Sequence, residues 1–204
     1  MTVSSIDLVD AGSPDKRLHT NQRTIASNAR EDQYFLRGQP AYPSYTVVVN
    51  AVSTATTNDH LLQIMADGTN YTRLVRYSVS NANNKPASLS ALQIAVYRLT
   101  TAGTGGTAKA EAAYDDADNY TGDIRYLPSS KGTEGQLIHR FWTNWPSTAS
   151  TSAPLYSYTW EMAPYMKPLI FGNSSSDGIA FKVLTAVASM DVSVQVEMLT
   201  TSYL

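Results

Sequence analysis

Histidine is the side chain most often used for acid–base catalysis and metal binding, because its ordinary pKa of about 6.5 lies near physiological pH. The chain has three histidines, His19, His60 and His139, which are scattered along the sequence. No second histidine and no carboxylate stands at ligand spacing from any of them. We therefore expect all three to be structural or surface histidines without a catalytic or metal-binding role.

Acidic side chains gather between positions 115 and 123, where Asp115, Asp116, Asp118 and Asp123 lie close to Asn119. Their oxygens are the ligand type that Ca²⁺ prefers, and this ion takes about six to eight of them. The spacing does not match the calcium-loop pattern D-x-[DN]-x-[DN]-G. A solvated loop is our preferred interpretation, and a calcium site is the alternative.

A glycine-rich segment, Gly103–Ala108, formally fits the pattern G-x-G-x-x-[GA] of dinucleotide-binding loops. That fingerprint also needs a helix that opens at the loop and an acidic residue at the end of the next parallel strand. The residues that follow, AKAEAAYDDADNY, are too few and too polar for such a crossover helix. We therefore predict a loop that binds no cofactor. No P-loop, GxSxG or HExxH motif occurs in the sequence.

Six aromatic residues are grouped between positions 141 and 160. Trp and Tyr rings can stack on the apolar faces of sugars, and they are also enriched in cores and subunit interfaces. Because the group falls on alternating strands, we favour a core or an interface over a glycan-binding site. The residues are Phe141, Trp142, Trp145, Tyr156, Tyr158 and Trp160.

The composition limits the classes of function. Charged residues make up 16% of the 204 residues, against about 25% in an average soluble protein. A net charge of −2 provides no basic field for nucleic acid. Without cysteine there is no disulfide framework, thiolate nucleophile or Cys-ligated zinc. No apolar run approaches the ~20 residues of a membrane span, and the first residues do not resemble a signal peptide.

The first 43 residues differ from the rest of the chain. They hold 10 of the 32 charged residues and show no sustained apolar alternation, and Pro40 and Pro43 close the segment. We predict that 1–43 is an N-terminal arm or lead-in, either a tail without order of its own or an arm that orders on a neighbouring subunit. A short helix over Thr24–Leu36 is a further possibility.

From Ser44 on, apolar and polar residues alternate at the period of β-strands. The Asp67-Gly68 pair between two such runs predicts a β-hairpin. The short turn after Ala186 predicts a second hairpin, with one buried and one solvated face. The predicted strands are Ser44–Val52, His60–Ala66, Tyr71–Ser80, Ser88–Thr100, Leu137–Trp142, Leu155–Glu161, Tyr165–Phe171, Gly178–Ala186 and Met190–Thr200, with a further short strand near Ala108–Tyr114 inside the irregular stretch Thr101–Gly135.

Eight to ten short strands without an amphipathic helix after residue 43 predict an all-β fold. The arrangement that buries one face of each strand is an antiparallel sandwich of two sheets over residues 44–204. Long crossing loops between about eight strands favour a jelly roll as its subtype.

Four segments between roughly residues 60 and 200 carry a family resemblance: HLLQIMADGTNYTRLVRYSV, LQIAVYRLTTAGTGGTA with the Asp-rich residues after it, LIHRFWTNW, and PLIFGNSSSDGIAFKVLTAVASMDVSVQVEM. In pattern and order they resemble small β-sandwich structural proteins of tailed bacteriophage virions, of the capsid decoration or cement type. The resemblance implies a sandwich built into the virion, seated on the capsid shell as an oligomer and commonly as a trimer. The group has no catalytic motif, so no site residue is implied.

Together these observations lead us to expect a non-enzymatic virion structural protein, a head decoration or cement protein that stabilises the major capsid shell. The expected partners are the major capsid protein and further copies of the chain in a homotrimer, with no nucleic acid and no membrane. We expect the protein on the capsid surface after synthesis in the host cytoplasm, with no cofactor and no catalytic, cofactor-binding or metal-binding residues. The alternative is a receptor- or glycan-binding jelly-roll module of a phage tail fibre or spike, which exposed Trp142, Trp145 and Trp160 would mark.

Overall fold

The computed structural model of the chain describes residues 4–9, 17–25, 28–33, 42–57, 59–82, 86, 88, 90–145, 157–163, 169–172 and 174–202. Side chains are described from Tyr42 on, except those of Asn144 and Trp145. The chain divides into two compact units, Met1–Ala41 and Tyr42–Leu204.

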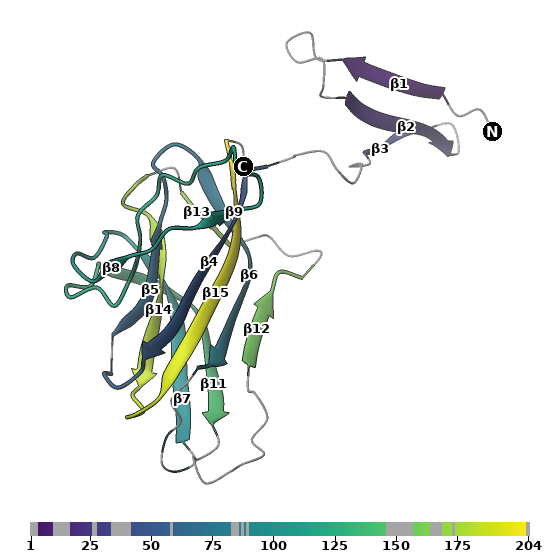
Figure 1. Cartoon of the computed structure of the whole chain (residues 1–204). Coiled ribbons are helices and arrows are strands. Elements are labelled where there is room, and N and C mark those ends of the chain that lie inside the picture. The colour runs from purple at the N-terminus through teal and green to yellow at the C-terminus, as the bar shows by residue number, and fades with distance from the viewer. Residues whose placement is uncertain are drawn as a thin grey trace. The chain divides into compact units, whose positions relative to one another are not determined.

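The first unit contains a three-stranded antiparallel sheet in the order β1-β2-β3 (Figure 1). β1 spans Ser4–Val9, β2 spans Arg17–Ile25 and β3 spans Asn28–Gln33. The helix considered over Thr24–Leu36 is wrong, because the described part of that segment is divided between β2 and β3. The segment lacks the apolar stripe that stabilises a helix, and pairing between the strands satisfies its backbone groups instead. The role of 1–43 as an arm on a neighbouring subunit stays a prediction.

The second unit is an antiparallel sandwich of two sheets packed face to face (Figure 1). Sheet I has the order β12-β6-β15-β4-β9, with β13 paired to β6, and sheet II has the order β11-β7-β14-β5-β10-β8. This confirms the all-β, two-sheet fold predicted from the alternation. The strands are β4 Ser44–Ser53, β5 His60–Met65, β6 Tyr71–Asn81, β7 Ser90–Leu99, β8 Thr107–Ala108, β9 Ala112–Ala113, β10 Ile124–Tyr126, β11 Glu134–Trp145, β12 Ser157–Glu161, β13 Leu169–Phe171, β14 Gly178–Thr185 and β15 Asp191–Thr201.

Most long strands that follow each other in the chain lie in different sheets, whereas β7 and β11 are neighbours in sheet II. β4 and β6 belong to sheet I, whereas β5 and β7 belong to sheet II, and β14 and β15 are divided in the same way. The two predicted hairpins are therefore wrong, because the Asp67-Gly68 turn joins β5 to β6 across the sandwich and the turn after Thr185 joins β14 to β15. A tight turn can join two strands of the same sheet or two strands of opposite sheets. The apolar face of each strand must pack against the opposite sheet, and this packing decides in which sheet the strand lies.

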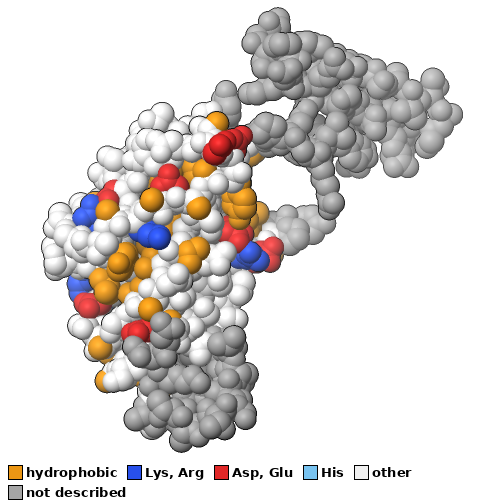
Figure 2. Space-filling view, viewed as in Figure 1, with side chains coloured by type: hydrophobic (Ala, Val, Ile, Leu, Met, Phe, Trp, Pro, Cys, Tyr) orange, Lys and Arg blue, Asp and Glu red, His pale blue; other side chains and the backbone are white. Residues whose placement is uncertain are grey.

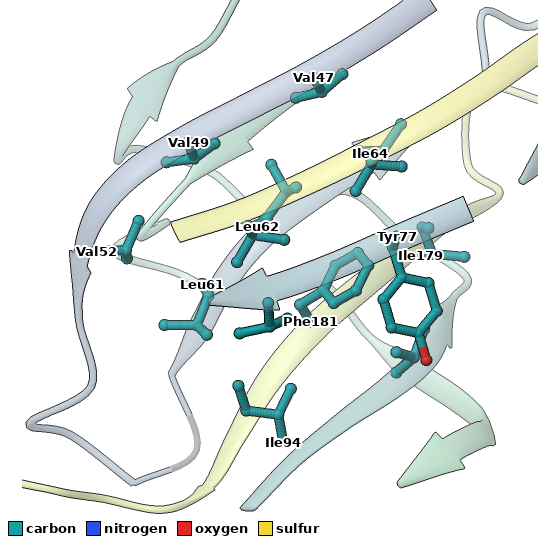
Figure 3. Packing of buried hydrophobic residues seen from close by; sticks show 14 of the residues in the cluster. Val47, Val49, Val52, Leu61, Leu62, Ile64, Tyr77, Ile94, Ile179 and Phe181 are labelled. Atoms are coloured by element: carbon teal, nitrogen blue, oxygen red, sulfur yellow. The ribbon is translucent and has the colours of Figure 1, made fainter. Parts of the chain in front are cut away.

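The core lies between the inner faces of the two sheets. On β15 the buried residues Val192, Val194 and Val196 alternate with partly exposed ones, as the sequence predicted for this strand. Figure 3 shows side chains of β4, β5, β6, β7 and β14 converging between the sheets. At the centre of this cluster the rings of Tyr77 and Phe181 meet edge to face, with centroids 5.1 Å apart.

The stretch Thr101–Gly135 contains three very short strands. β9 pairs with β4 and β10 pairs with β5, so the stretch contacts both sheets. β8 and β9 lie where a short strand was expected near Ala108–Tyr114, whereas β10 was not expected. Close packing fixes the backbone here, because Gly106 has φ +72° and a Cβ on it would lie 2.5 Å from the carbonyl oxygen of Leu127. Only glycine adopts this conformation without strain.

Candidate functional site

A buried polar network lies on the face of sheet II that is turned away from sheet I. The backbone N–H of Gly103 donates to Gln63 Oε1 (3.0 Å), and Gln63 Nε2 donates to His60 Nδ1 (2.5 Å). His60 Nε2 in turn donates to Glu134 Oε1 (2.9 Å), and Lys182 Nζ donates to Glu134 Oε2 (2.8 Å). Because the backbone N–H orients the Gln63 amide, the amide fixes the tautomer of His60.

The charges in this network are set by burial and by these contacts. Burial lowers the pKa of His60 below its ordinary value, and the hydrogen bond to Glu134 offsets part of that effect. Burial also opposes ionisation of Glu134, but the hydrogen bonds from Lys182 and His60 outweigh it and hold the pKa of this carboxyl below its ordinary value. At neutral pH the network is a neutral imidazole, a carboxylate and an ammonium. The imidazole has no exposed surface, so no substrate can reach it.

The network and one tyrosine attach the stretch Thr101–Gly135 to the sheets. Gly103 and Glu134 hold its two ends through the contacts above. Between them, the hydroxyl of Tyr120 donates to the backbone oxygen of Met65 (2.6 Å). Burial raises the pKa of Tyr120, so the hydroxyl keeps its proton. Through these contacts His60 and Tyr120 connect this part of the surface to the sheets.

The imidazole of His139 joins the two sheets. His139 lies on β11 of sheet II, and its two ring nitrogens are hydrogen-bonded to the hydroxyls of Tyr77 on β6 and Tyr158 on β12, both in sheet I. Burial lowers the pKa of His139 and raises the pKa of both tyrosines. His60 and His139 therefore both have structural contacts. His19 lies in β2, where no side chain is described.

The predicted aromatic group divides between the core and the surface. The rings of Phe141 and Tyr158 are stacked, with centroids 3.9 Å apart, and Trp160 stacks on Tyr77 at 5.4 Å. These rings close the sandwich at the edge formed by β11 and β12. Trp142 points the other way and is 58% exposed.

Two members of the aromatic group cannot be placed. Tyr156 lies outside the described residues, and at Trp145 only the backbone is described. The exposed group Trp142, Trp145 and Trp160 that would mark a glycan site is therefore represented by Trp142 alone in the described side chains.

The acidic residues between 115 and 123 make separate contacts. Asp115 accepts a hydrogen bond from the backbone N–H of Ala117 (3.0 Å), and Asp123 accepts one from Arg125 Nε (2.6 Å). The described part of the chain brings no three His, Cys, Asp or Glu side chains together as a metal site. The calcium site is therefore not assembled by the described residues.

The glycine-rich segment Gly103–Ala108 is a connection between strands. It leads from β7 into β8, and a β-bridge pairs Thr104 with Ser130. The dinucleotide fingerprint needs a helix N-terminus at this point, but the described residues after the segment form β8 and β9. The described residues therefore lack the strand–loop–helix arrangement of that fingerprint.

The outer face of sheet I is covered by small hydroxyl side chains, and we call it the hydroxyl face. In one row across the sheet Ser157, Ser80 and Ser193 are paired in register. The next row contains Thr159, Ser78, Gln195 and Val48. The members of these two rows form the hydroxyl face.

No charged side chain lies within these two rows. The row beyond them contains Arg76 and Glu197, which form an ion pair. Figure 2, viewed as in Figure 1, shows hydrophobic side chains and separate red and blue patches on a mostly white surface. A neutral hydroxyl costs much less to desolvate than a charge. This face is therefore suited to being covered by another protein.

Several of these residues carried no signal in the sequence. Gln63, Glu134 and Lys182 belong to no motif and come from three strands, so only the fold brings them together. The signal for the hydroxyl face was present in the strand alternation, because Ser and Thr occupy the non-apolar positions of three strands.

Comparison of the chain with protein-family models, with curated proteins and with solved structures finds no match in any of the three. Within the described residues, no helix has the length and hydropathy required to cross a bilayer.

Proposed function

We propose that the chain is a non-enzymatic structural protein of a virion, a head decoration or cement protein that binds and stabilises the major capsid shell. The observation that carries the proposal is the hydroxyl face of sheet I. Its two rows of paired Ser, Thr, Gln and Val side chains make a broad surface without charge, which can be buried against a partner at low desolvation cost.

The order of the eight longer strands supports the kind of sandwich expected for this role. Sheet I contains β12-β6-β15-β4 and sheet II contains β11-β7-β14-β5, so the first and last of these strands, β4 and β15, lie side by side. Consecutive strands change sheets except β7 and β11, which are paired in sheet II. We infer that this is a jelly roll, which is built from eight strands in two sheets. The resemblance to phage decoration proteins implies the same kind of architecture.

The proposed partners are the major capsid protein and other copies of the chain. A homotrimer on the capsid surface would bring several copies of the hydroxyl face against the shell or against each other. Many modest contacts repeated over a lattice give a stable attachment without any single tight site.

The experiment measures binding of the purified full-length chain to shells that lack it. Ser78→Lys and Gln195→Lys each place a charge in the middle of the hydroxyl face, and we expect either to weaken binding at least about tenfold because the ammonium must be desolvated. Ala91→Lys, at an exposed position on β7 of sheet II, is the matched control and should bind like wild type. Equal binding by all three variants would refute the proposed contact surface.

A second function is favoured by one observation. The 58% exposure of Trp142 is what a glycan-binding module of a tail fibre or spike would need. A reconstruction of the particle separates the two, because a decoration protein lies on the head and a receptor-binding module lies on the tail.

A further inference from the structure

Two neighbouring rows of residues lie on the outer face of sheet II at its β11 edge. In the first row Trp142 on β11 is paired with Gln93 on β7, which is paired with Thr185 on β14. In the second row Arg140 is paired with Ala95. Both rows face away from the core, since the residues between them on β7 and β11 are the buried Ile94 and Phe141.

The amide of Gln93 is the unusual feature of this surface. The side chain is 8% exposed, and among the described residues it has no hydrogen-bond or other polar partner. Its polar atoms are not among the fully buried side-chain atoms that lack a partner. A ligand seated beside Trp142 can therefore accept from and donate to this amide.

Trp142 supplies the flat apolar surface next to that amide. Residues paired directly across two strands have Cβ atoms about 5 Å apart, so the indole and the Gln93 amide reach the same ligand. An aromatic ring face is electron-rich and attracts the polarised C–H groups of a sugar ring. Hydroxyl and acetamido groups of the same sugar are the natural partners of a primary amide.

The charge on this surface indicates which saccharide fits. Arg140 is exposed and lies two residues from Trp142 on the same face, about 7 Å along the strand. The described residues contain no ion-pair partner for it. A guanidinium binds a carboxylate through two parallel hydrogen bonds. The neighbouring cation, Lys182, is already bonded to Glu134.

We propose that Trp142, Gln93 and Arg140 form a binding site for an acidic saccharide unit, one that carries a carboxylate on the sugar ring. Trp142 stacks on the apolar face of the ring, Gln93 bonds its hydroxyl or acetamido groups, and Arg140 binds its carboxylate. Nucleic acid fits less well, because the single unpaired cation in the described part of this surface neutralises too little of a phosphate backbone. The proposal is independent of the proposed attachment to a capsid, which uses sheet I.

The test is a titration of the full-length chain with sialyllactose and with trigalacturonate. Binding is measured by Trp fluorescence and by calorimetry. Lactose and galactotriose are the uncharged match of sialyllactose and of trigalacturonate, respectively. A single-stranded oligonucleotide tests whether the surface prefers nucleic acid. At least one acidic saccharide should bind with a Kd of about 1 mM or below, and about tenfold more tightly than its uncharged match. Binding of neither acidic saccharide, equal binding of the uncharged match, or preference for the oligonucleotide would overturn the proposal.

Four variants assign the contacts. Trp142→Ala should abolish binding, and Arg140→Met should reduce the affinity for the acidic saccharide to that of its uncharged match. Gln93→Met should weaken binding about tenfold without lowering the melting temperature, because no hydrogen bond among the described residues is lost. Tyr114→Ala removes an exposed aromatic in another part of the surface and should bind like wild type. Wild-type affinity in Trp142→Ala or Arg140→Met would also overturn the proposal.

Discussion

The imidazole of His139 on β11 and the hydroxyl of Tyr77 on β6 are hydrogen-bonded to each other across the sandwich, so that one side-chain contact joins sheet II to sheet I. Tyr77 is 2% exposed, and its ring packs on Phe181 and Trp160. A hydrogen bond in such surroundings is costly to lose, because water cannot easily replace either partner. This contact therefore fixes how the two sheets meet at the β11 edge.

Removing the hydroxyl of Tyr77 tests this relationship. We expect Tyr77→Phe to lower the free energy of unfolding by about 1–2 kcal/mol, because a half-buried ring nitrogen of His139 loses its partner. Tyr158→Phe should cost less, since Tyr158 is more exposed. Urea denaturation of the full chain measures both losses. A Tyr77→Phe variant as stable as wild type would show that the bond does not hold the sheets together.

The stability of the protein should depend on pH through its buried histidines. Burial lowers the pKa of both His60 and His139 below the ordinary value of 6.5. The unfolded chain therefore binds protons near pH 6.5 that the folded chain does not bind. The contribution of these groups is fully present above about pH 6.5 and is lost as the pH falls.

We expect the free energy of unfolding to be level between about pH 8 and 7 and to decrease towards about pH 5. Denaturant titrations at each pH measure the slope. The double variant Tyr77→Phe/His139→Phe replaces a hydrogen-bonded pair by two apolar rings, and it should show a shallower slope because the contribution of His139 is removed. A stability that increases as the pH falls would contradict the account.

The ion pair in the polar network should behave as a coupled unit. Lys182→Met leaves the Glu134 carboxylate without its cation and should cost about 2 kcal/mol, and Glu134→Gln should cost about 1–2 kcal/mol. The double variant should lose less than the sum, because the Gln amide oxygen still accepts from His60 and no unpaired charge remains. A double-mutant cycle that gives strictly additive losses would rule out this coupling.

Two backbone positions with positive φ predict effects of opposite sign. Ala51 lies in an irregularity of β4 with φ +54°, and Ala51→Gly should stabilise the chain by about 0.5 kcal/mol, since glycine avoids the left-handed strain. Gly106→Ala should destabilise it by about 2–3 kcal/mol, because its Cβ would lie 2.5 Å from the oxygen of Leu127. Thermal unfolding measures both changes, and a shift of the same sign in the two variants would contradict the assignment.

The inner face of each strand could be predicted from the sequence, and the pairing of the strands could not. Leu92 and Ile94 share the face of β7 that the alternation predicted to be buried, and both are buried, but Gln93 and Ala95 on the other face are buried as well. The Asp67-Gly68 turn carried the right turn chemistry but did not reveal that its two strands belong to different sheets. Turn residues determine where the chain reverses, whereas the choice of partner depends on apolar faces that are distant in the sequence.

The polar contacts were hidden for the same reason. His60 and Glu134 are 74 residues apart, and Tyr77 and His139 are 62 residues apart. Neither pair has a spacing that a motif would show. Trp142 and Gln93 lie on opposite strands of one ladder, so their relation depends on the register of β11 against β7. Register is set by the packing of the whole sheet.

A reconstruction of the virus particle by electron cryomicroscopy tests the central claim most directly. The account predicts density for the sandwich on the outer surface of the head, with the hydroxyl face around Ser78 and Ser193 covered by the capsid shell or by another copy of the chain. Density found only on the tail, or a sandwich on the head whose hydroxyl face is open to solvent, would contradict it.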